Sequence, residues 1–257
     1  MTVLLDIMYV GTAYAGWQVQ PNAPTVQAVL GAAVEQLLGR RYPVTGCSRT
    51  DSGVHANSFC CTVSGLPQDM PVPVDRMPAA LSSVLPGDIS VRRATAVPDG
   101  FHPRYDCLGK EYRYLIWNGR TRNPFLAGRA LHRPRPLDEE RMNEAAQYLV
   151  GEQDFASFVA SGSKAGAGGD TVRRIYSAAV ARSGDEVSFR VSGNGFLYNM
   201  VRIMVGTLIG VSEGKYSPSD IGGIIAARDR SAAGITAPAC GLYLEQVFYP
   251  EWVWNGK

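Results

Sequence analysis

The sequence is poor in the residues that metal centres and disulfide frameworks require. It holds only three histidines and five cysteines in 257 residues, and no CxxC pair occurs. Structural zinc sites need about four Cys or His ligands at regular spacing, and a disulfide framework needs an even number of cysteines. A chain of this length can bury a core without disulfide bonds. We therefore expect reduced thiols in a cytoplasmic protein. We do not expect a metal site.

The common catalytic and nucleotide-binding signatures are also missing. The sequence contains no GxxxxGK[ST], no HExxH and no GxSxG, which argues against a P-loop, a zinc protease and a serine hydrolase. Its most apolar later stretch, residues 196–211, is short and includes Asn199 and Arg202, so we expect no membrane span. The first residues carry Asp6 within an apolar run and lack a basic region, which is typical of a strand and not of a signal peptide.

Charge is unevenly distributed along the chain. The net charge is only +2, yet residues 92–135 hold ten basic and three acidic side chains, and nine of the ten are arginine. Arginine matches phosphate oxygens and stacks on bases, so this basic block is consistent with a polyanion partner. A solvated surface paired with acids from elsewhere is the alternative.

Hydrophobic periodicity predicts strands and helices in both halves of the chain. Thr25 is an expected helix N-cap, and Gly39 an expected helix end. The pattern favours an α+β or mixed sheet with helices on one side. We divide the chain into an N-terminal α/β half, 1–105, and a C-terminal α/β half, 106–257. The Gly-rich segment 161–170 is an expected mobile loop. The expected helices are 25–39, 72–85, 137–151, 196–214 and 217–229, and the expected strands are 3–9, 58–65, 86–97, 112–119, 171–182, 186–193 and 242–250.

The segment GCSRTDSGVHA, residues 46–56, places Arg49, Asp51 and His55 close together among small residues. An exposed aspartate is ionised at neutral pH and can act as a base or nucleophile. Asp followed by Ser-Gly is equally typical of an Asx-turn. The local sequence leaves both interpretations open.

Two further side chains stand out against their surroundings. Tyr112 falls on the same face of an expected strand as Tyr114 and Ile116, where a tyrosine is usually core but can also stack on a base or exchange a proton. Arg202 lies inside an apolar helical pattern, where an unpaired charge is costly. A buried arginine needs a carboxylate, and Asp51 is one candidate among 23 acidic residues.

A resemblance to a known family adds to these observations. The segments GTAYAGWQVQPNAPTVQAVL, SRTDSGVHA, LPGDISV, FHPRYDCLGKEYRYLIWN, GEQDFASF, FLYNMVRIMVGTLIGV and GLYLEQV occur in this order. Together they closely resemble the tRNA pseudouridine synthase A (TruA) family through nearly the whole chain. Ser48, Ser52 and Val10 depart from its usual pattern, outside the reacting groups.

The resemblance implies the roles of the candidate residues. Asp51 corresponds to the nucleophile, Arg202 to the arginine paired with that carboxylate, and Tyr112 to the tyrosine that contacts the target base, as a base or by stacking. Arg49 and His55 belong to the same signature and are expected to hold the loop or contact RNA. Whether Asp51 attacks the uracil ring or the anomeric carbon of the sugar stays open.

The resemblance also implies a fold, a substrate and an assembly. The family has two similar halves with largely antiparallel sheets joined across a central cleft, with helices on the outer faces. It isomerises uridine to pseudouridine in the anticodon stem-loop of tRNA, typically at tRNA positions 38–40, as a homodimer and without metal or cofactor. An RNA-binding protein without catalysis is the alternative, and a glycoside hydrolase is weaker because its paired carboxylates are not apparent.

Overall fold

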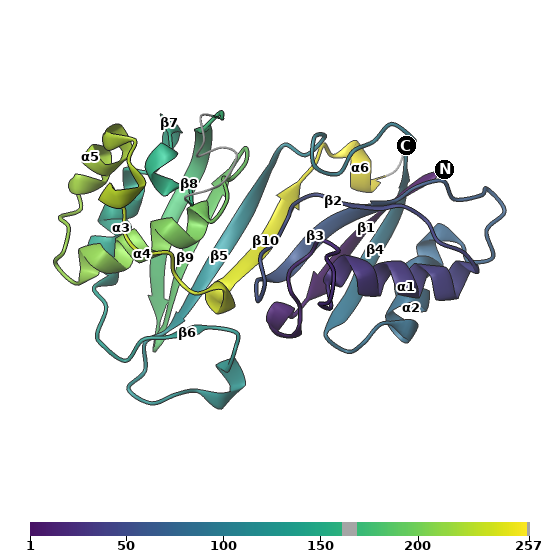
Figure 1. Ribbon diagram of the computed structural model, residues 1–257, viewed down its shortest axis with the longest axis horizontal. Coiled ribbons are helices and arrows are strands. Elements are labelled where there is room, and N and C mark those ends of the chain that lie inside the picture. The colour runs from purple at the N-terminus through teal and green to yellow at the C-terminus, as the bar shows by residue number, and fades with distance from the viewer. Residues whose placement is uncertain (161–168, 256–257) are drawn as a thin grey trace. The chain divides into compact units, whose positions relative to one another are not determined.

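The computed structural model describes residues 1–160 and 169–255. Most of the Gly-rich segment 161–170, expected to form a mobile loop, therefore lies outside the described residues. The chain is a mixed α+β protein with mainly antiparallel strand pairs, as expected (Figure 1). It divides into two compact units, the first made of residues 1–108 with 243–257 and the second of residues 109–242.

The first unit is built on a sheet in which β1 lies between β3 and β4. Both of these pairings are antiparallel. The short strand β2 adds to β3 in antiparallel orientation, while β10 runs parallel to it, with Tyr243 opposite His55. Its strands are β1 (Thr2–Tyr9), β2 (Val44–Gly46), β3 (His55–Val63), β4 (Ile89–Val97) and β10 (Leu242–Phe248), and its α-helices are α1 (Val26–Leu38), α2 (Met77–Val84) and α6 (Trp252–Asn255).

Local sequence explains both ends of α1. The Thr25 side chain accepts a hydrogen bond from the Ala28 N–H, which satisfies one of the first N–H groups of the helix. Gly39 adopts a φ of 77°, a left-handed conformation in which glycine is favoured at a helix end. The buried side chains of α1 include Leu30 and Val34, which lie one turn apart on one face. The helix therefore begins and ends where the sequence predicts.

A buried carboxylate joins three strands of the first unit. Asp6 on β1 is fully buried and accepts hydrogen bonds from Arg92 Nη2 at 2.7 Å, Arg93 Nε at 3.0 Å and the Ser58 hydroxyl at 2.8 Å. The Arg93 guanidinium also lies 3.8 Å from the centre of the Trp254 ring. Two members of the arginine-rich block thus compensate a buried charge of the sheet, and the expectation that the whole block faces phosphate does not hold for them.

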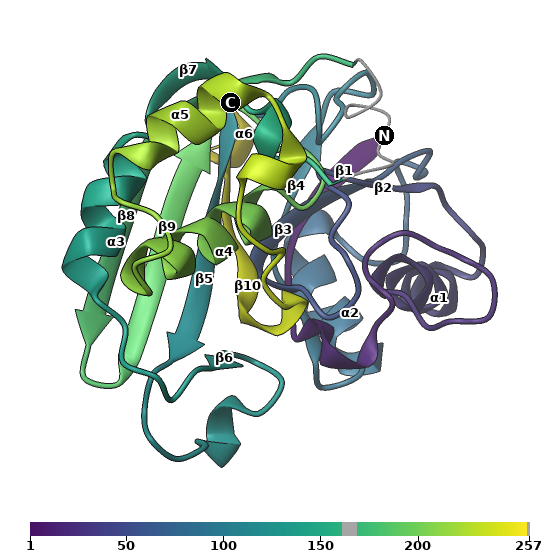
Figure 2. The same cartoon turned by 60° about the vertical axis from the view of Figure 1, so that its left-hand side comes forward.

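The second unit contains an antiparallel sheet in the order β5-β9-β8-β7. The short strand β6 runs parallel to β5. Helix α3 packs on β8 and on α4, and Figure 2 shows α4 beside β5 and β9. The strands are β5 (Gly109–Trp117), β6 (Leu131–His132), β7 (Gly151–Asp154), β8 (Val172–Ser183) and β9 (Glu186–Gly193), and the α-helices are α3 (Glu139–Gln147), α4 (Met200–Ser212) and α5 (Asp220–Ala227).

The division into units differs from the expected halves at the end of the chain. Residues 243–257, expected in the C-terminal half, belong to the first unit. The reason is the parallel pairing of β10 with β3 and the packing of Trp254 on Arg93.

Two further expectations concern membranes and thiols. Among the described residues, no helix combines the length and the apolar character that a membrane crossing requires. None of the five cysteines forms a disulfide bond, and Cys47, Cys60 and Cys61 are buried. Burial is the main cause that raises the pKa of the Cys60 and Cys61 thiols well above the ordinary value.

Candidate active site

Asp51 lies in a tight turn that leads into β3. The Val54 N–H donates to the Asp51 carbonyl at 3.1 Å, and Gly53 has a φ of 79°, which favours glycine. The preceding Thr50 is buried, whereas the Asp51 side chain is half-buried. The structure thus shows a turn at Asp51, and the role of its carboxylate as a reagent stays a prediction.

The turn is fastened to the segment that follows β1. The Trp17 N–H donates to the Thr50 carbonyl at 3.1 Å, and the Gly53 N–H donates to the Tyr14 carbonyl at 3.3 Å. Gly16, with a φ of 89°, approaches so closely that an added Cβ would lie 2.4 Å from the Thr50 carbonyl oxygen. The backbone on either side of Asp51 is thus held by contacts that tolerate no side chain at position 16.

His55 supports this loop from inside the unit. Its side chain is buried, and Nδ1 accepts a hydrogen bond from the Gly11 N–H at 2.9 Å. Its ring stacks on that of Tyr243 with centroids 4.7 Å apart. A Cβ on Gly11 would lie 1.9 Å from the Val54 carbonyl oxygen. Of the two expected roles of His55, this geometry favours holding the loop over contacting RNA.

Several residues that support the Asp51 turn could not be singled out from the sequence. The Tyr9 hydroxyl and the Thr50 hydroxyl lie 2.8 Å apart in the buried interior, and Gly11 and Gly16 permit the close approach of two loops. The only sequence signal is the glycine spacing in GTAYAGW, which does not reveal its partner loop.

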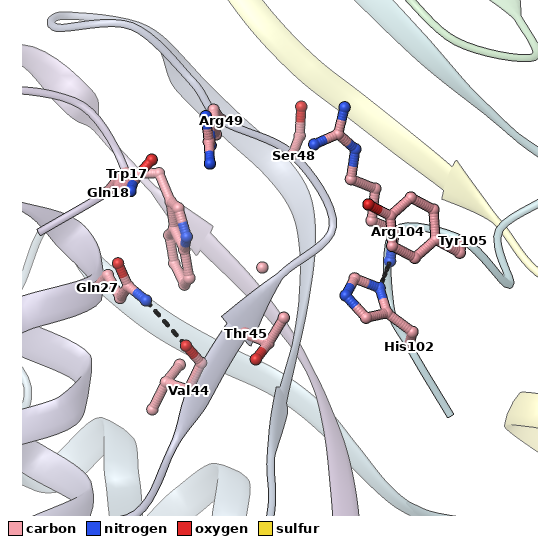
Figure 3. Close-up of a pocket in the computed structure, with 11 residues that line it drawn as sticks. Trp17, Gln18, Gln27, Val44, Thr45, Ser48, Arg49, His102, Arg104 and Tyr105 are labelled. Carbon is pink, nitrogen blue, oxygen red and sulfur yellow. Dashed lines mark hydrogen bonds between the residues drawn. The ribbon is translucent and has the colours of Figure 1, made fainter. Parts of the chain in front are cut away.

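Arg49 is exposed beside the turn and lines a pocket of about 260 Å³ in the first unit. The other residues that line this pocket include Trp17, Ser48, Arg104 and Tyr105 (Figure 3). Arg49 is therefore placed to contact a ligand, in keeping with one of its two expected roles.

Tyr112 lies on β5 in the second unit. Its side chain is buried, and its ring packs edge-on against Phe196 with centroids 5.1 Å apart. Its neighbour on the same face, Tyr114, is fully buried and donates its hydroxyl to the Pro238 carbonyl at 2.8 Å. Burial raises the pKa of Tyr114, so this second tyrosine is a structural member of the core.

Arg202 lies in the first turn of α4, also in the second unit, and is half-buried. Its Nε donates to the Ala237 carbonyl at 2.7 Å, and Nη1 donates to the Asn199 side chain at 2.8 Å. Asn199 adopts a left-handed φ of 59° at the start of the helix. These contacts fix the orientation of a guanidinium that carries five donors in all. Asp51 belongs to the first unit, so its pairing with Arg202 stays a prediction.

Within residues 1–160 and 169–255, no group of three or more His, Cys, Asp or Glu side chains is arranged to hold a metal ion.

Comparisons with known proteins agree with the residue patterns. The family model described as tRNA pseudouridine synthase matches residues 7–106 and 145–250, which include Asp51 and Arg202 but not Tyr112. Curated relatives called tRNA pseudouridine synthase A are similar to the chain over nearly its whole length. One from Ruminiclostridium cellulolyticum is 47% identical over 96% of this chain and 99% of the relative. One from Bacillus pumilus is 43% identical over 97% of this chain and 99% of the relative.

The matched ranges contain the hydrogen-bonded turn around Asp51 and the helix that carries Arg202. A family model that covers most of a chain, together with relatives of this identity, is decisive for membership. This chain belongs to the tRNA pseudouridine synthase A family, whose members are isomerases that act on tRNA.

Proposed function

We propose that this protein converts uridine to pseudouridine in the anticodon stem-loop of tRNA, at tRNA positions 38–40, with Asp51 as the nucleophile. The observation that carries the proposal is the turn around Asp51 in the first unit, which backbone hydrogen bonds hold in place. Three backbone hydrogen bonds, from Trp17, Gly53 and Val54, fix the chain around the Asp51 carboxylate, which stays half-buried. A nucleophile held in one geometry gains rate because less freedom is lost on reaching the transition state.

The reaction exchanges an N–C glycosidic bond for a C–C bond. Asp51 attacks the bound uridine, the N–C bond breaks, and the uracil turns before C5 bonds to the sugar and the Asp51 carboxylate is released. C5 then loses its proton and N1 gains one, so the product is an isomer of the substrate. The target base must leave its stack to reach Asp51, at a cost of a few kcal/mol.

Arg202 and Tyr112 of the second unit are proposed to complete the site. The guanidinium of Arg202 is already oriented by Ala237 and Asn199, so it can stabilise a carboxylate at little additional entropic cost. Tyr112 is proposed to contact the uracil, as a stacking wall or as the group that accepts the C5 proton. Its buried ring, braced by Phe196, suits a wall that must not move.

The exposed part of the basic block is proposed to contact the RNA backbone. Between residues 112 and 137 the chain has no acidic residue. Arg120, Arg122 and Arg135 are exposed in this stretch, and Phe125 among them is 80% exposed. Arginine with an exposed aromatic ring is the combination that binds phosphate and stacks on bases. We propose that the protein acts on tRNA as a homodimer in the cytoplasm.

One assay tests the reaction and its nucleophile. Unmodified tRNA carrying tritium at C5 of uridine releases tritium to water when pseudouridine forms. We expect release by the wild-type protein and by Asp69→Asn, an exposed carboxylate control. We expect none by Asp51→Asn, which keeps the shape of the side chain and loses its charge.

The other outcomes separate the alternatives. Wild-type protein that binds tRNA without releasing tritium would be an RNA-binding protein only, and free uracil would indicate a hydrolase. Tritium release by Asp51→Asn at the wild-type rate would refute the nucleophile assignment. Sequencing of the product tRNA after chemical labelling of pseudouridine locates the modified positions.

A further inference from the structure

The pocket beside the Asp51 turn has the chemistry of a nucleotide site. It lies wholly within the first unit, and its lining includes two arginines, Arg49 and Arg104, but no acidic residue. Both arginines are exposed, and neither forms an ion pair with any residue that the structure describes. Two uncompensated guanidinium groups around one hollow favour an anionic ligand, and phosphate oxygens match their geometry.

An aromatic ring lies next to these charges. Tyr105 is 75% exposed, an unusual state for a tyrosine of a folded chain. Its ring lies 4.3 Å from that of His102, centre to centre, and 5.8 Å from the Arg104 guanidinium. Figure 3 shows Arg104, Tyr105 and His102 together on one side of the pocket, with Trp17 and Gln27 on the other. Most of the Tyr105 ring therefore remains available to a stacked base.

The segment that presents Arg104 and Tyr105 is already ordered. The Asp106 carboxylate accepts a hydrogen bond from the His102 N–H at 2.7 Å. His102 Nδ1 accepts one from the Arg104 N–H at 3.1 Å, and the His102 carbonyl accepts one from the Tyr105 N–H at 3.1 Å. A turn closed by these bonds holds the two side chains before a ligand arrives, which lowers the entropic cost of binding.

Size and position indicate which nucleotide the pocket takes. Its volume of about 260 Å³ lies just under the range of about 300–1,000 Å³ typical of small-molecule sites, so it suits part of a longer ligand. Arg49 is two residues from Asp51, a separation of at most about 7 Å along the chain. Stacked nucleotides follow one another at about 3.4 Å.

We propose that this pocket binds a nucleotide of the tRNA strand one or two positions from the target uridine, with its base on Tyr105 and its phosphate between Arg49 and Arg104. The proposal rests on the proposed function, because it names the RNA contact of the same site. It makes Arg104 and Tyr105 substrate-binding residues and gives the Arg49 guanidinium a partner outside the protein.

The test measures RNA binding separately from the reaction. Anticodon stem-loop RNAs carry 2-aminopurine one or two nucleotides from the target uridine, and Asp51→Asn is the background, so that no turnover occurs. Binding quenches the 2-aminopurine fluorescence when the base stacks. In this background we expect Tyr105→Ala to abolish the quenching and weaken affinity about 5- to 150-fold, the range set by loss of one base–aromatic stack. Tyr105→Phe keeps both properties.

Matched controls come from helix α3 and its end. Tyr148 is 43% exposed and Arg141 is exposed. Tyr148→Ala and Arg141→Ala keep the affinity of the Asp51→Asn parent, whereas Arg104→Ala weakens it and makes binding less dependent on salt. Equal affinity and quenching in Tyr105→Ala and its parent would overturn the proposal, as would equal losses in Tyr105→Ala and Tyr148→Ala. Absence of pseudouridine formation by the wild-type protein would defeat the proposed function instead, and the fluorescence result would stand apart from it.

Discussion

Substitution of Gly16 by alanine tests whether the contacts that hold the Asp51 turn in place are needed for the reaction. An alanine at this φ of 89° costs about 1–2 kcal/mol, because its Cβ approaches the following carbonyl oxygen. The same Cβ would lie 2.4 Å from the Thr50 carbonyl oxygen, so the two loops must separate. Loss of the hydrogen bond from Trp17 to Thr50 adds about 0.5–1.5 kcal/mol.

The total is a loss of about 1.5–3.5 kcal/mol in the free energy of unfolding. For a chain of this size that lowers the melting temperature by about 3–14 °C. Displacement of the turn by about 1 Å also lowers the rate of tritium release about 100-fold at temperatures where the protein stays folded.

Gly39→Ala is the matched control. Gly39 has a φ of 77°, yet an added Cβ meets nothing within 4 Å. This variant carries the backbone strain of about 1–2 kcal/mol without the clash, and keeps the wild-type rate. Thermal unfolding and single-turnover tritium release are measured on both variants. If Gly16→Ala matched Gly39→Ala in stability and rate, the close approach at Gly16 would have no role in positioning Asp51.

Three further perturbations address the loop support, the RNA surface and the thiols. His55→Ala leaves the buried Gly11 N–H without its acceptor and lowers the free energy of unfolding by about 1–3 kcal/mol in urea; an unchanged midpoint would contradict the supporting role. Arg122→Glu weakens tRNA binding and reduces the slope of log affinity against log salt by about one; an unchanged slope in filter binding would remove this residue from the RNA surface. At pH 8, Cys60 and Cys61 stay unmodified by iodoacetamide in the folded protein and react in guanidinium, because burial raises their pKa and keeps them protonated. Mass spectrometry measures the labelling, and modification of either thiol in the folded protein would contradict this prediction.

Local features could be predicted from the sequence, whereas features set by distant partners could not. Helix α1 begins after Thr25 and ends at Gly39 as expected, because capping depends on nearby residues. The short strands β2 and β6 carry little periodicity of their own and exist through pairing with β3 and β5. Likewise, β10 was expected as a strand, but its parallel partner β3 lies far away in sequence.

The candidate site shows the same limit. Sequence patterns singled out Asp51, and the turn around it follows from Gly53. The need for glycine at Gly11 and Gly16 arises only when a second loop approaches, so neither could be recognised in one dimension. Similarly, the role of Arg92 became visible only with buried Asp6 beside it.

The first unit consists of two separate stretches of the chain, one before and one after the second unit. The ribosome therefore completes the first unit last. All of residues 109–242 leave the ribosome before Tyr243, which stacks on His55 beneath the Asp51 turn. The second unit is complete in sequence before residues 243–257 are made, whereas the first lacks its last strand until then. A chain interrupted before residue 243 would therefore carry the Asp51 turn without the Tyr243 ring that stacks on His55.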